Sequence, residues 1–334
     1  TSTPTTATST QGNPSDPLAK PSYIKVAAFN IAELGNPFMK KDFKAIAQII
    51  NGFDLIVLQE VQDVGGSEAV QAIYNELNKI AETVYLSPLI IPKAGIGFRS
   101  PAGYAPEGYA FIYRNPVQLD SRFIPTHAFR YDNHDIYGRI PAFVHFKAGQ
   151  FDFVLVGVHL QWTDTDQRKM EMLDIKAWLT EFAAKDSTQE QDLIIAGDMN
   201  RYGVVGSVTA EVISKHQAPF DVFLDVNQLY KSYRLITLEF LPTLATRYAA
   251  LDEQSTTVGI DKNLYDQIII SSGAFEEHGA SPSQFGEQIG VVAFDMLPPW
   301  NGMTTSAMKS AVSDHRPVWA RFRIDLQDTD SPLL

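Results

Sequence analysis

The sequence predicts an α/β sandwich in which two packed sheets carry helices on their outer faces. Short apolar runs of strand length alternate with segments whose apolar residues recur at helical spacing. The order strand, helix, strand ending in an acidic residue occurs at residues 24–60 and again at residues 151–198. Because each half has apolar faces to cover, two such halves indicate two sheets that pack against each other.

The first half begins with Ile24–Ile31, an apolar run rich in β-forming residues. Met39–Asn51 follows with apolar residues at helical spacing and stops at Gly52, which predicts a helix. Leu55–Leu58 has the length and composition of a second buried strand, and Glu68–Ala81 has the pattern of a second amphipathic helix.

The rest of the chain predicts further strands around one long helix. A strand pair is expected around Asn115-Pro116, a hairpin around residues 148–150, and a helix at about Asp166–Ala184. Residues 201–264 and 273–312 are rich in loop-forming residues. The predicted strands are Tyr109–Arg114, Val117–Phe123, Ala142–Lys147, Phe151–Leu160, Leu193–Ala196, Gln267–Ser271 and Val318–Phe322.

The composition predicts one globular domain at residues 22–327. With 45% hydrophobic residues among 334, the chain has ample material for a core. Residues 1–21 are rich in Thr, Ser and Pro and are expected to form a disordered tether, and residues 328–334 a loose tail. The chain has no cysteine, which excludes disulfides, thiolate metal sites and cysteine nucleophiles. No apolar run approaches the ~20 residues of a membrane helix, so we expect no stable membrane insertion.

The net charge of −12 argues against binding of polyanions through bulk charge, which usually needs a basic surface. A protein of this composition that acts on a polyanion has to offset repulsion with a bound cation and local Arg or Lys. The chain starts with Thr instead of Met, which is typical of a mature terminus after removal of a signal or lipid anchor. We therefore expect a secreted, periplasmic or cell-surface protein; the alternative is an arbitrary start of the chain.

Polar side chains able to bind cations or transfer protons recur at the ends of the predicted strands. The carboxyl end of one strand lies beside the amino end of its antiparallel neighbour, so residues at such opposite ends can gather on one edge. A carboxylate that close to a core is costly unless it is paired or binds a cation. The candidates are Asn30, Glu60, His159, Asp198, Asn200, Asp266, Asp314 and His315.

Each candidate also has an ordinary explanation when it is taken alone. Asn30 and Asn200 suit turns, and Glu60 suits the solvated end of a strand. A single histidine such as His159 is more often a hydrogen-bonded core residue than a catalytic one. The recurrence of such polar residues at six strand ends favours a single shared site. Its oxygen donors are the ligands that Mg²⁺, Mn²⁺ or Ca²⁺ prefer, and its histidines titrate near neutral pH.

Six segments of the chain resemble the endonuclease/exonuclease/phosphatase superfamily, most closely deoxyribonuclease I and related bacterial surface nucleases. The resemblance covers roughly Ile24 to Ile324 and implies a four-layer α/β/β/α sandwich of two packed mixed sheets, with the site at one edge. The segments, which also occur in the order of the family, are Ala27–Ile31, Gln59–Asp63, Glu107–Arg114, Gly197–Asn200, Tyr265–Ile268 and Ser313–Val318.

The resemblance implies a divalent cation, expected to be Mg²⁺ with Mn²⁺ or Ca²⁺ as alternatives. Its principal ligand would be Glu60, assisted by Asn30 and Asp314. In the chemistry of phosphodiesters, such a cation offsets charge that develops on the phosphoryl and leaving oxygens.

The resemblance also implies two acid–base pairs, His315 with Asp266 and His159 with Glu107. A histidine held by a carboxylate can take a proton from water, and a second one can protonate the leaving alkoxide. Which histidine is the base stays open. Asp198 and Asn200 are implied to position the attacking water or to contact the scissile phosphate, and Arg139 is implied to contact a phosphate of the DNA.

The expected activity is hydrolysis of nucleic acid, most of all DNA, by in-line attack of water that leaves a 5′-phosphate and a 3′-hydroxyl. The alternatives are a phosphomonoesterase, a sphingomyelinase-type lipid phosphodiesterase and a non-catalytic binding module. DNA contacts of the family are missing where Ala32, Gln62 and Ala105 replace larger residues, and Ile140 replaces a calcium-binding Glu. We expect a monomer, and the sequence indicates no protein partner.

Overall fold

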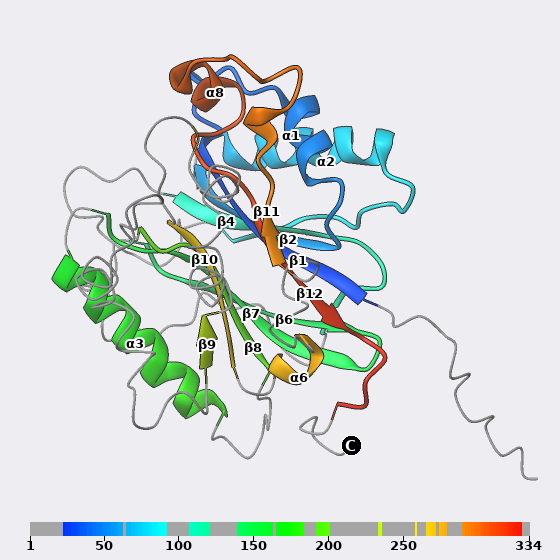
Figure 1. Ribbon diagram of the computed structural model, residues 1–334, viewed down its shortest axis with the longest axis vertical. Coiled ribbons are helices and arrows are strands. Elements are labelled where there is room, and N and C mark those ends of the chain that lie inside the picture. Colours follow the sequence, from blue (N-terminus) through cyan, green and yellow to red (C-terminus); the bar gives the residue numbers. More distant parts are fainter. Residues whose placement is uncertain are drawn as a thin grey trace, which may run out of the picture.

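The computed structural model contains two six-stranded mixed sheets that pack against each other, with helices on their outer faces. The four-layer α/β/β/α sandwich predicted from the sequence is therefore confirmed (Figure 1). The residues that the structure describes are 23–62, 65–91, 107–120, 139–162, 165–183, 192–200, 233–235, 258, 265–271, 274–278 and 289–328. The predicted tether at residues 1–21 and residues 329–334 of the predicted tail lie outside them.

The first sheet contains both the beginning and the end of the described chain. Helices α1 (Phe43–Ile50), α2 (Gly66–Ile80) and α8 (Thr305–Ala311) lie on its outer side (Figure 1). In spatial order its strands are β11 (Ile289–Val291), β12 (Val318–Arg323), β1 (Tyr23–Leu34), β2 (Leu55–Gln62), β4 (Glu107–Tyr113) and β3 (Leu89–Ile91).

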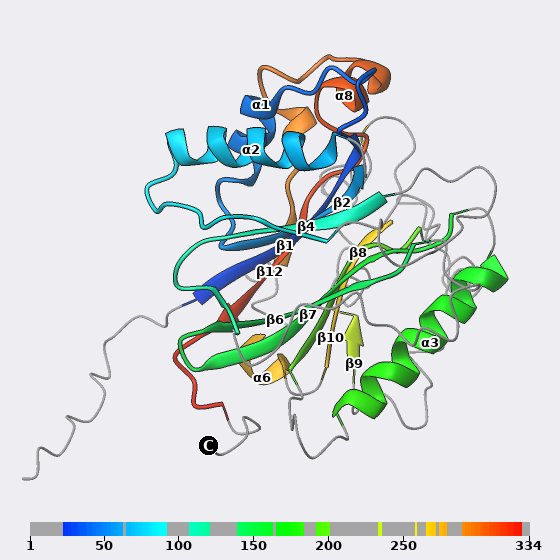
Figure 2. The same cartoon turned by 180° about the vertical axis from the view of Figure 1, so that it is seen from behind.

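The second sheet is built from the middle of the chain, and α3 (Thr165–Ala183) lies along its outer face (Figure 2). Short helices at α6 (Ala274–His278) and η4 (Phe294–Met296) join later elements. None of the described helices is both long and apolar enough to cross a membrane. In spatial order the strands are β5 (Gln118–Leu119), β6 (Ala142–Ala148), β7 (Phe151–His159), β8 (Leu193–Asp198), β10 (Asp266–Ser271) and β9 (Tyr233–Leu235).

Each sheet contains one parallel pair at its centre, and these pairs correspond to the two related halves of the sequence. Strands β1 and β2 are parallel and are joined through α1, while β7 and β8 are parallel and are joined through α3. Strand β12 runs antiparallel to β1, and β10 runs antiparallel to β8. The carboxyl ends of the parallel strands therefore lie beside the amino ends of β10 and β12.

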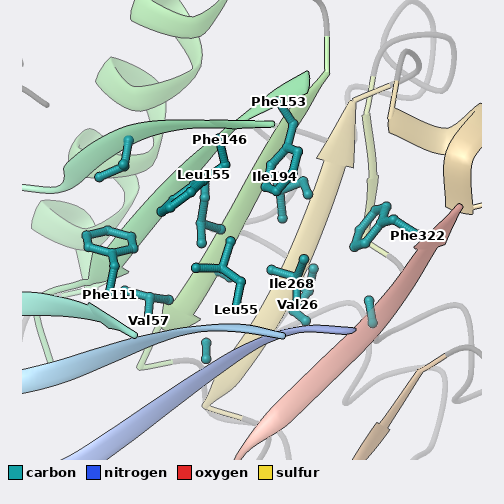
Figure 3. Close-up of a cluster of buried hydrophobic side chains, with 14 of the residues drawn as sticks. Val26, Leu55, Val57, Phe111, Phe146, Phe153, Leu155, Ile194, Ile268 and Phe322 are labelled. Carbon is teal, nitrogen blue, oxygen red and sulfur yellow. The ribbon is translucent and has the colours of Figure 1, made fainter. Parts of the chain in front are cut away.

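Alternating residues of the central strands fill three apolar layers. Val26 of β1 and Leu55 of β2 point between the sheets, where they face Leu155 and other side chains of the second sheet (Figure 3). Phe29 of β1 points the other way, toward α1 and α2. Val154 of β7 points toward α3. Because side chains alternate along a strand, one buried strand supplies two layers, which explains its continuous apolar sequence.

Three elements differ from the predicted ones. Helix α1 begins at Phe43 instead of Met39, because the Asp42 carboxylate accepts a hydrogen bond from the Ala45 amide and caps the helix there. The strand predicted at residues 117–123 is limited to β5 among the described residues. The segment 273–312, expected to be loop-rich, also contains α6, β11 and α8.

Candidate functional site

Asn30 connects the two sheets at the edge where their parallel strands end. It is 1% exposed, and its Nδ2 donates to Glu60 Oε1 and to Asp198 Oδ2, both at 3.0 Å. Its Oδ1 is buried and has no hydrogen-bond partner among the described residues. A buried acceptor without a partner is costly, so this oxygen is available for a ligand.

Glu60 is held in an irregular part of β2. The pairing of β2 with β4 shifts between Leu58 and Val61, and Glu60 has a φ of 59°. Its Oε2 accepts a hydrogen bond of 2.8 Å from the amide of Glu33, which itself has a φ of 53°. Backbone conformations of this kind in non-glycine residues are costly and often occur at functional sites.

The environment of Glu60 favours its charged form. Burial by itself raises the pKa of the carboxyl group, but His159 and the hydrogen bonds from Glu33 and Asn30 outweigh it. Together they lower the pKa of Glu60 to about 2. The group is therefore a carboxylate at neutral pH.

His315 and Asp266 form a short buried pair. The His315 Nδ1 donates to Asp266 Oδ2 at 2.8 Å, and Asp266 is completely buried. The other ring nitrogen, Nε2, lies 3.7 Å from Asp198 Oδ2. Burial lowers the pKa of His315, but the carboxylates of Asp266 and Asp198 outweigh burial and raise it to about 10. The resemblance to the family implied this pair.

His159 occupies the corresponding place at the end of β7, where it pairs in register with Asp198 of β8. Its Nε2 lies 3.5 Å from Asp198 Oδ2, and its Nδ1 lies 3.5 Å from Glu107 Oε2. Arg139 donates to the other oxygen of Glu107. The His159–Glu107 pair is therefore looser than the His315–Asp266 pair. Burial, and next the charge of Arg139, lower the pKa of His159 to about 4.

Asp198 follows a residue that has to be glycine. Gly197 has a φ of 146°, and a Cβ atom there would overlap the carbonyl oxygen of Val158 on the neighbouring strand. Asp198 Oδ1 accepts a hydrogen bond of 2.8 Å from the Asn200 amide. Asn200 Nδ2 in turn donates to the carbonyl oxygen of Leu160 at 2.8 Å, so the two segments after β7 and β8 are joined.

Asp314 lies at the more open side of this group. Its side chain is 29% exposed, and its Oδ2 is 3.1 Å from Lys309 Nζ. Another set of possible cation ligands lies deeper: ligand atoms of Glu60, Glu107 and His159 are all within 4.8 Å of one another. The structure thus places Asn30 against Glu60, as the predicted ligand set requires, while Asp314 is paired with an ammonium.

Ser313 is a structural residue of the site that the sequence analysis did not single out. It is completely buried, and its Oγ donates to the carbonyl oxygen of Asn30 at 2.6 Å. The same oxygen accepts from the amides of Ala32 at 3.3 Å and His315 at 3.0 Å. Ser313 therefore fixes the segment that carries Asp314 and His315 against the end of β1. Its place in the Ser-Asp-His segment was the available signal.

Two buried charged residues of α3 were also missed. Glu171, which is completely buried, accepts a hydrogen bond of 2.8 Å from the Gln161 amide. Arg168 donates to the carbonyl oxygens of Gln161 at 2.7 Å and Trp162 at 3.3 Å. These side chains hold the segment that directly follows His159. In the sequence, charges three apart on a helix equally suit a solvated face, so the pattern gave no distinct signal.

The residues at this edge suit a divalent cation. Glu60 is ionised and fixed by hydrogen bonds, and Asn30 offers a buried oxygen without a partner. Both are hard oxygen donors of the kind that Mg²⁺, Mn²⁺ and Ca²⁺ prefer. The donor set therefore fits such an ion, and it contains no thiolate.

The buried His159 predicts a loss of stability in acid. In the folded protein the ring stays neutral down to about pH 4, whereas in the unfolded chain it takes a proton near pH 6.5. The unfolded state thus binds more protons below pH 6.5, and folding stability falls as the pH drops toward 4. In denaturant titrations the free energy of unfolding should fall between pH 7 and pH 4.5 in both proteins. We expect the fall in His159→Gln to be roughly 2 kcal/mol smaller than in the wild type.

The control is Gln71→Ala, which changes an exposed, non-titrating side chain of α2 outside the site. It should lose as much stability between the two pH values as the wild type does. Equal losses in the wild type and His159→Gln would contradict the prediction.

The fold and the site place histidine–carboxylate pairs beside an acidic edge of a two-sheet sandwich, where the oxygen donors suit a cation. Residues 27–205, more than half of the chain, match the Endonuclease/Exonuclease/phosphatase family. The chain belongs to this family, whose members are nucleases, phosphodiesterases and phosphatases.

The chain is similar in sequence to two mammalian proteins over most of its length. It is 25% identical to deoxyribonuclease-1-like 2 of Mus musculus, across 90% of this chain and 92% of that protein. It is 24% identical to deoxyribonuclease-1 of Rattus norvegicus over the same shares of both chains.

Solved structures agree with the fold. A family protein from Bacteroides thetaiotaomicron has a TM-score of 0.53 at 16% identity, covering 92% of this chain and all of that one. A family protein from Leptotrichia buccalis has a TM-score of 0.54 at 14% identity, covering 90% of this chain and 99% of that one.

Proposed function

We propose that the protein is a divalent-cation-dependent nuclease that cleaves phosphodiester bonds within nucleic acid, preferentially DNA. One observation carries the proposal: a single carboxylate oxygen, Oδ2 of Asp198, lies 3.0 Å from Asn30 Nδ2, 3.5 Å from His159 Nε2 and 3.7 Å from His315 Nε2. Side chains from both sheets thus converge on one point, beside Glu60. This arrangement suits a reaction that needs both proton transfer and stabilisation of negative charge.

In this proposal Glu60 and Asn30 would hold the cation, with Asp314 as a third ligand. When bound, the cation offsets the negative charge that develops on the phosphoryl oxygens and on the leaving oxygen. Mg²⁺ is the expected ion because hard oxygen donors predominate, and Mn²⁺ and Ca²⁺ suit the same donors.

The protein side chains then carry out the proton transfers. A water oxygen attacks phosphorus in line with the bond to the 3′ oxygen, and one histidine takes the water proton. The P–O3′ bond breaks, and the other histidine gives a proton to the departing 3′ oxygen, leaving a 5′-phosphate and a 3′-hydroxyl. His159 and His315 fill these two roles, with Glu107 and Asp266 orienting them, and Asp198 and Asn200 contact the water or phosphate.

Nucleic acid is the proposed substrate because both mammalian relatives are named as deoxyribonucleases and align over 90% of this chain. Arg139, the predicted phosphate contact, lies at the site but already donates to Glu107 and, through Nη1 at 3.5 Å, to the Leu160 carbonyl oxygen, so a phosphate would have to compete with these acceptors. Ala32 is buried and offers no charge to a DNA groove. Ala105 lies outside the described residues, so the proposal concerns the hydrolytic centre and not the mode of groove binding.

The test is a panel of substrates incubated with the purified full chain, with Mg²⁺ or with a chelator. The panel contains supercoiled plasmid DNA, RNA, sphingomyelin vesicles, an inositol polyphosphate and a sugar phosphate. We expect Mg²⁺-dependent nicking of the plasmid, with no nicking when the chelator is present.

Products from the other substrates of the panel, without nicking of DNA, would contradict the proposal. Release of phosphocholine without nicking would assign a lipid phosphodiesterase, and release of inorganic phosphate would assign a phosphomonoesterase. An absence of any product, with Mg²⁺ bound, would indicate a binding module.

A further inference from the structure

We propose that Lys309 contacts a substrate phosphate, and that its side chain becomes available when a divalent cation takes its place on Asp314. The inference rests on the proposed function and adds to it a specific cationic contact. The last turn of α8 carries Lys309, and its Nζ lies 3.1 Å from Asp314 Oδ2. An ammonium group cannot ligate a metal ion, so here it occupies an oxygen that the predicted ligand set assigns to the cation.

The pair lies where both solvent and an ion can reach it. The side chain of Lys309 is 38% exposed, and that of Asp314 is 29% exposed. Two cations that approach the same carboxylate oxygen repel each other, and a divalent ion attracts the carboxylate more strongly than an ammonium does. Binding of the ion at Asp314 therefore favours movement of the Lys309 ammonium away from it.

The backbone beneath Lys309 is fixed, so the movement is confined to the side chain. Lys41 Nζ donates to the carbonyl oxygens of Lys309 at 2.8 Å and Val312 at 2.9 Å. The Asp42 amide also donates to the carbonyl oxygen of Ala311 at 2.8 Å. These contacts close the end of α8, while the long lysine side chain keeps its own rotamer freedom.

Three other cations near this edge, Arg316, Arg139 and Lys41, are already held by protein partners. Arg316 makes two hydrogen bonds to Asp295, at 2.7 and 2.8 Å, and is buried. Arg139 is paired with Glu107, and Lys41 is held by the two carbonyl oxygens. A polyanion that approaches this acidic edge of a chain with a net charge of −12 meets repulsion. Lys309 is placed to reduce that repulsion beside the bound ion.

The binding experiment compares Lys309→Met with its parent in a His159→Ala background, in which cleavage of DNA should be at least about 100-fold slower than in the wild type. Affinity for a short fluorescein-labelled DNA duplex is measured by anisotropy over a range of salt concentrations. With Mg²⁺ we expect Lys309→Met to bind about 10-fold more weakly and to lower the slope of log affinity against log salt by about 0.9. With chelator, where Asp314 holds the ammonium, we expect less than a roughly twofold change.

Two further variants separate charge from structure. Lys309→Arg keeps the positive charge and should restore most of the affinity. Lys79→Met removes an exposed lysine of α2, paired with Glu76, and should have no Mg²⁺-dependent effect. A weakening of DNA binding by Lys309→Met that is equal with Mg²⁺ and with chelator would overturn the proposal, because it would reflect bulk charge or folding.

A second measurement does not depend on nucleic acid. Calorimetric titration with Mg²⁺ should show a several-fold tighter ion site in Lys309→Met, because the competing ammonium is gone, and no change in Lys79→Met. An unchanged Mg²⁺ affinity in Lys309→Met would overturn the inference. If the parent protein binds Mg²⁺ but no DNA, the proposed function fails, and this titration still decides whether the ion and Lys309 compete for Asp314.

Discussion

Replacing Glu60 with Gln should lower the rate of Mg²⁺-dependent plasmid nicking by about 10³-fold or more. The amide keeps the size of the side chain but removes the negative charge that a cation needs. In the structure this charge is held by the Glu33 amide and Asn30 and is favoured down to about pH 2. The measurement is the initial nicking rate of wild type and variant, with unfolding curves to confirm that both are folded.

A matched control for Glu60→Gln is Glu68→Gln. Glu68 is an exposed residue in the first turn of α2, so its loss should leave the nicking rate unchanged. Calorimetry with Mg²⁺ adds an independent reading, since Glu60→Gln should weaken ion binding as well. A folded Glu60→Gln protein with normal Mg²⁺ affinity and a normal rate would contradict the assignment of Glu60 as the principal ligand.

The second large effect concerns the two histidines. His159→Ala and His315→Ala should each lower turnover by about 10²- to 10⁴-fold, as expected for removal of an acid–base group. Both rings lie within 3.7 Å of the same oxygen of Asp198, so neither can take over the role of the other without moving. Single-turnover rates under Mg²⁺ saturation measure the effect on chemistry directly. Near-normal turnover in both variants would remove the two-histidine mechanism.

Asp266→Asn tests how the His315 ring is held. The buried carboxylate is the strongest influence that raises the pKa of His315, so its neutralisation should lower that pKa from about 10 toward the ordinary value. NMR titration of the imidazole resonances follows this shift, and the high-pH limb of the rate profile should move in the same direction. An exposed pair offers the control: Asp325→Asn, next to Arg323, should change neither. An unchanged titration of His315 in Asp266→Asn would contradict this role.

Much of the fold was predictable because the central strands are buried on both faces. Side chains of β1, β2, β7 and β8 fill layers on each side of their sheets, so these strands are continuous apolar runs that a sequence pattern detects. The repeated order of strand, helix and strand was confirmed as two parallel pairs. Where the sequence was less regular, as at α8, the element depends on a local cap by Thr304 and on a hydrogen bond from the Asp42 amide to the Ala311 carbonyl oxygen, which a pattern of apolar residues does not reveal.

The residue types of the candidate site and its histidine–carboxylate pairs were expected in advance, but its ion pairs with basic residues were not. Each strand-end residue named from the sequence lies within the described part of the structure. Two ion pairs with basic residues could not be predicted: Arg139 is paired with Glu107, and Lys309 is paired with Asp314. Such ion pairs depend on side-chain directions after two sheets have packed, and spacing along the chain carries no information about them.

The sequence alone determined that acidic and imidazole groups lie at the ends of buried strands, because a strand that is apolar throughout leaves its nearest polar side chains at the edge of the sheet. Only the tertiary structure decided that these strand ends from the two sheets lie next to each other. The register of β7 with β8 and the hydrogen bonds of Asn30 across the two sheets bring them together. The physical reason is that hydrogen bonds and charge interactions between side chains act over a few ångströms. Whether two side chains come that close depends on how the two sheets pack.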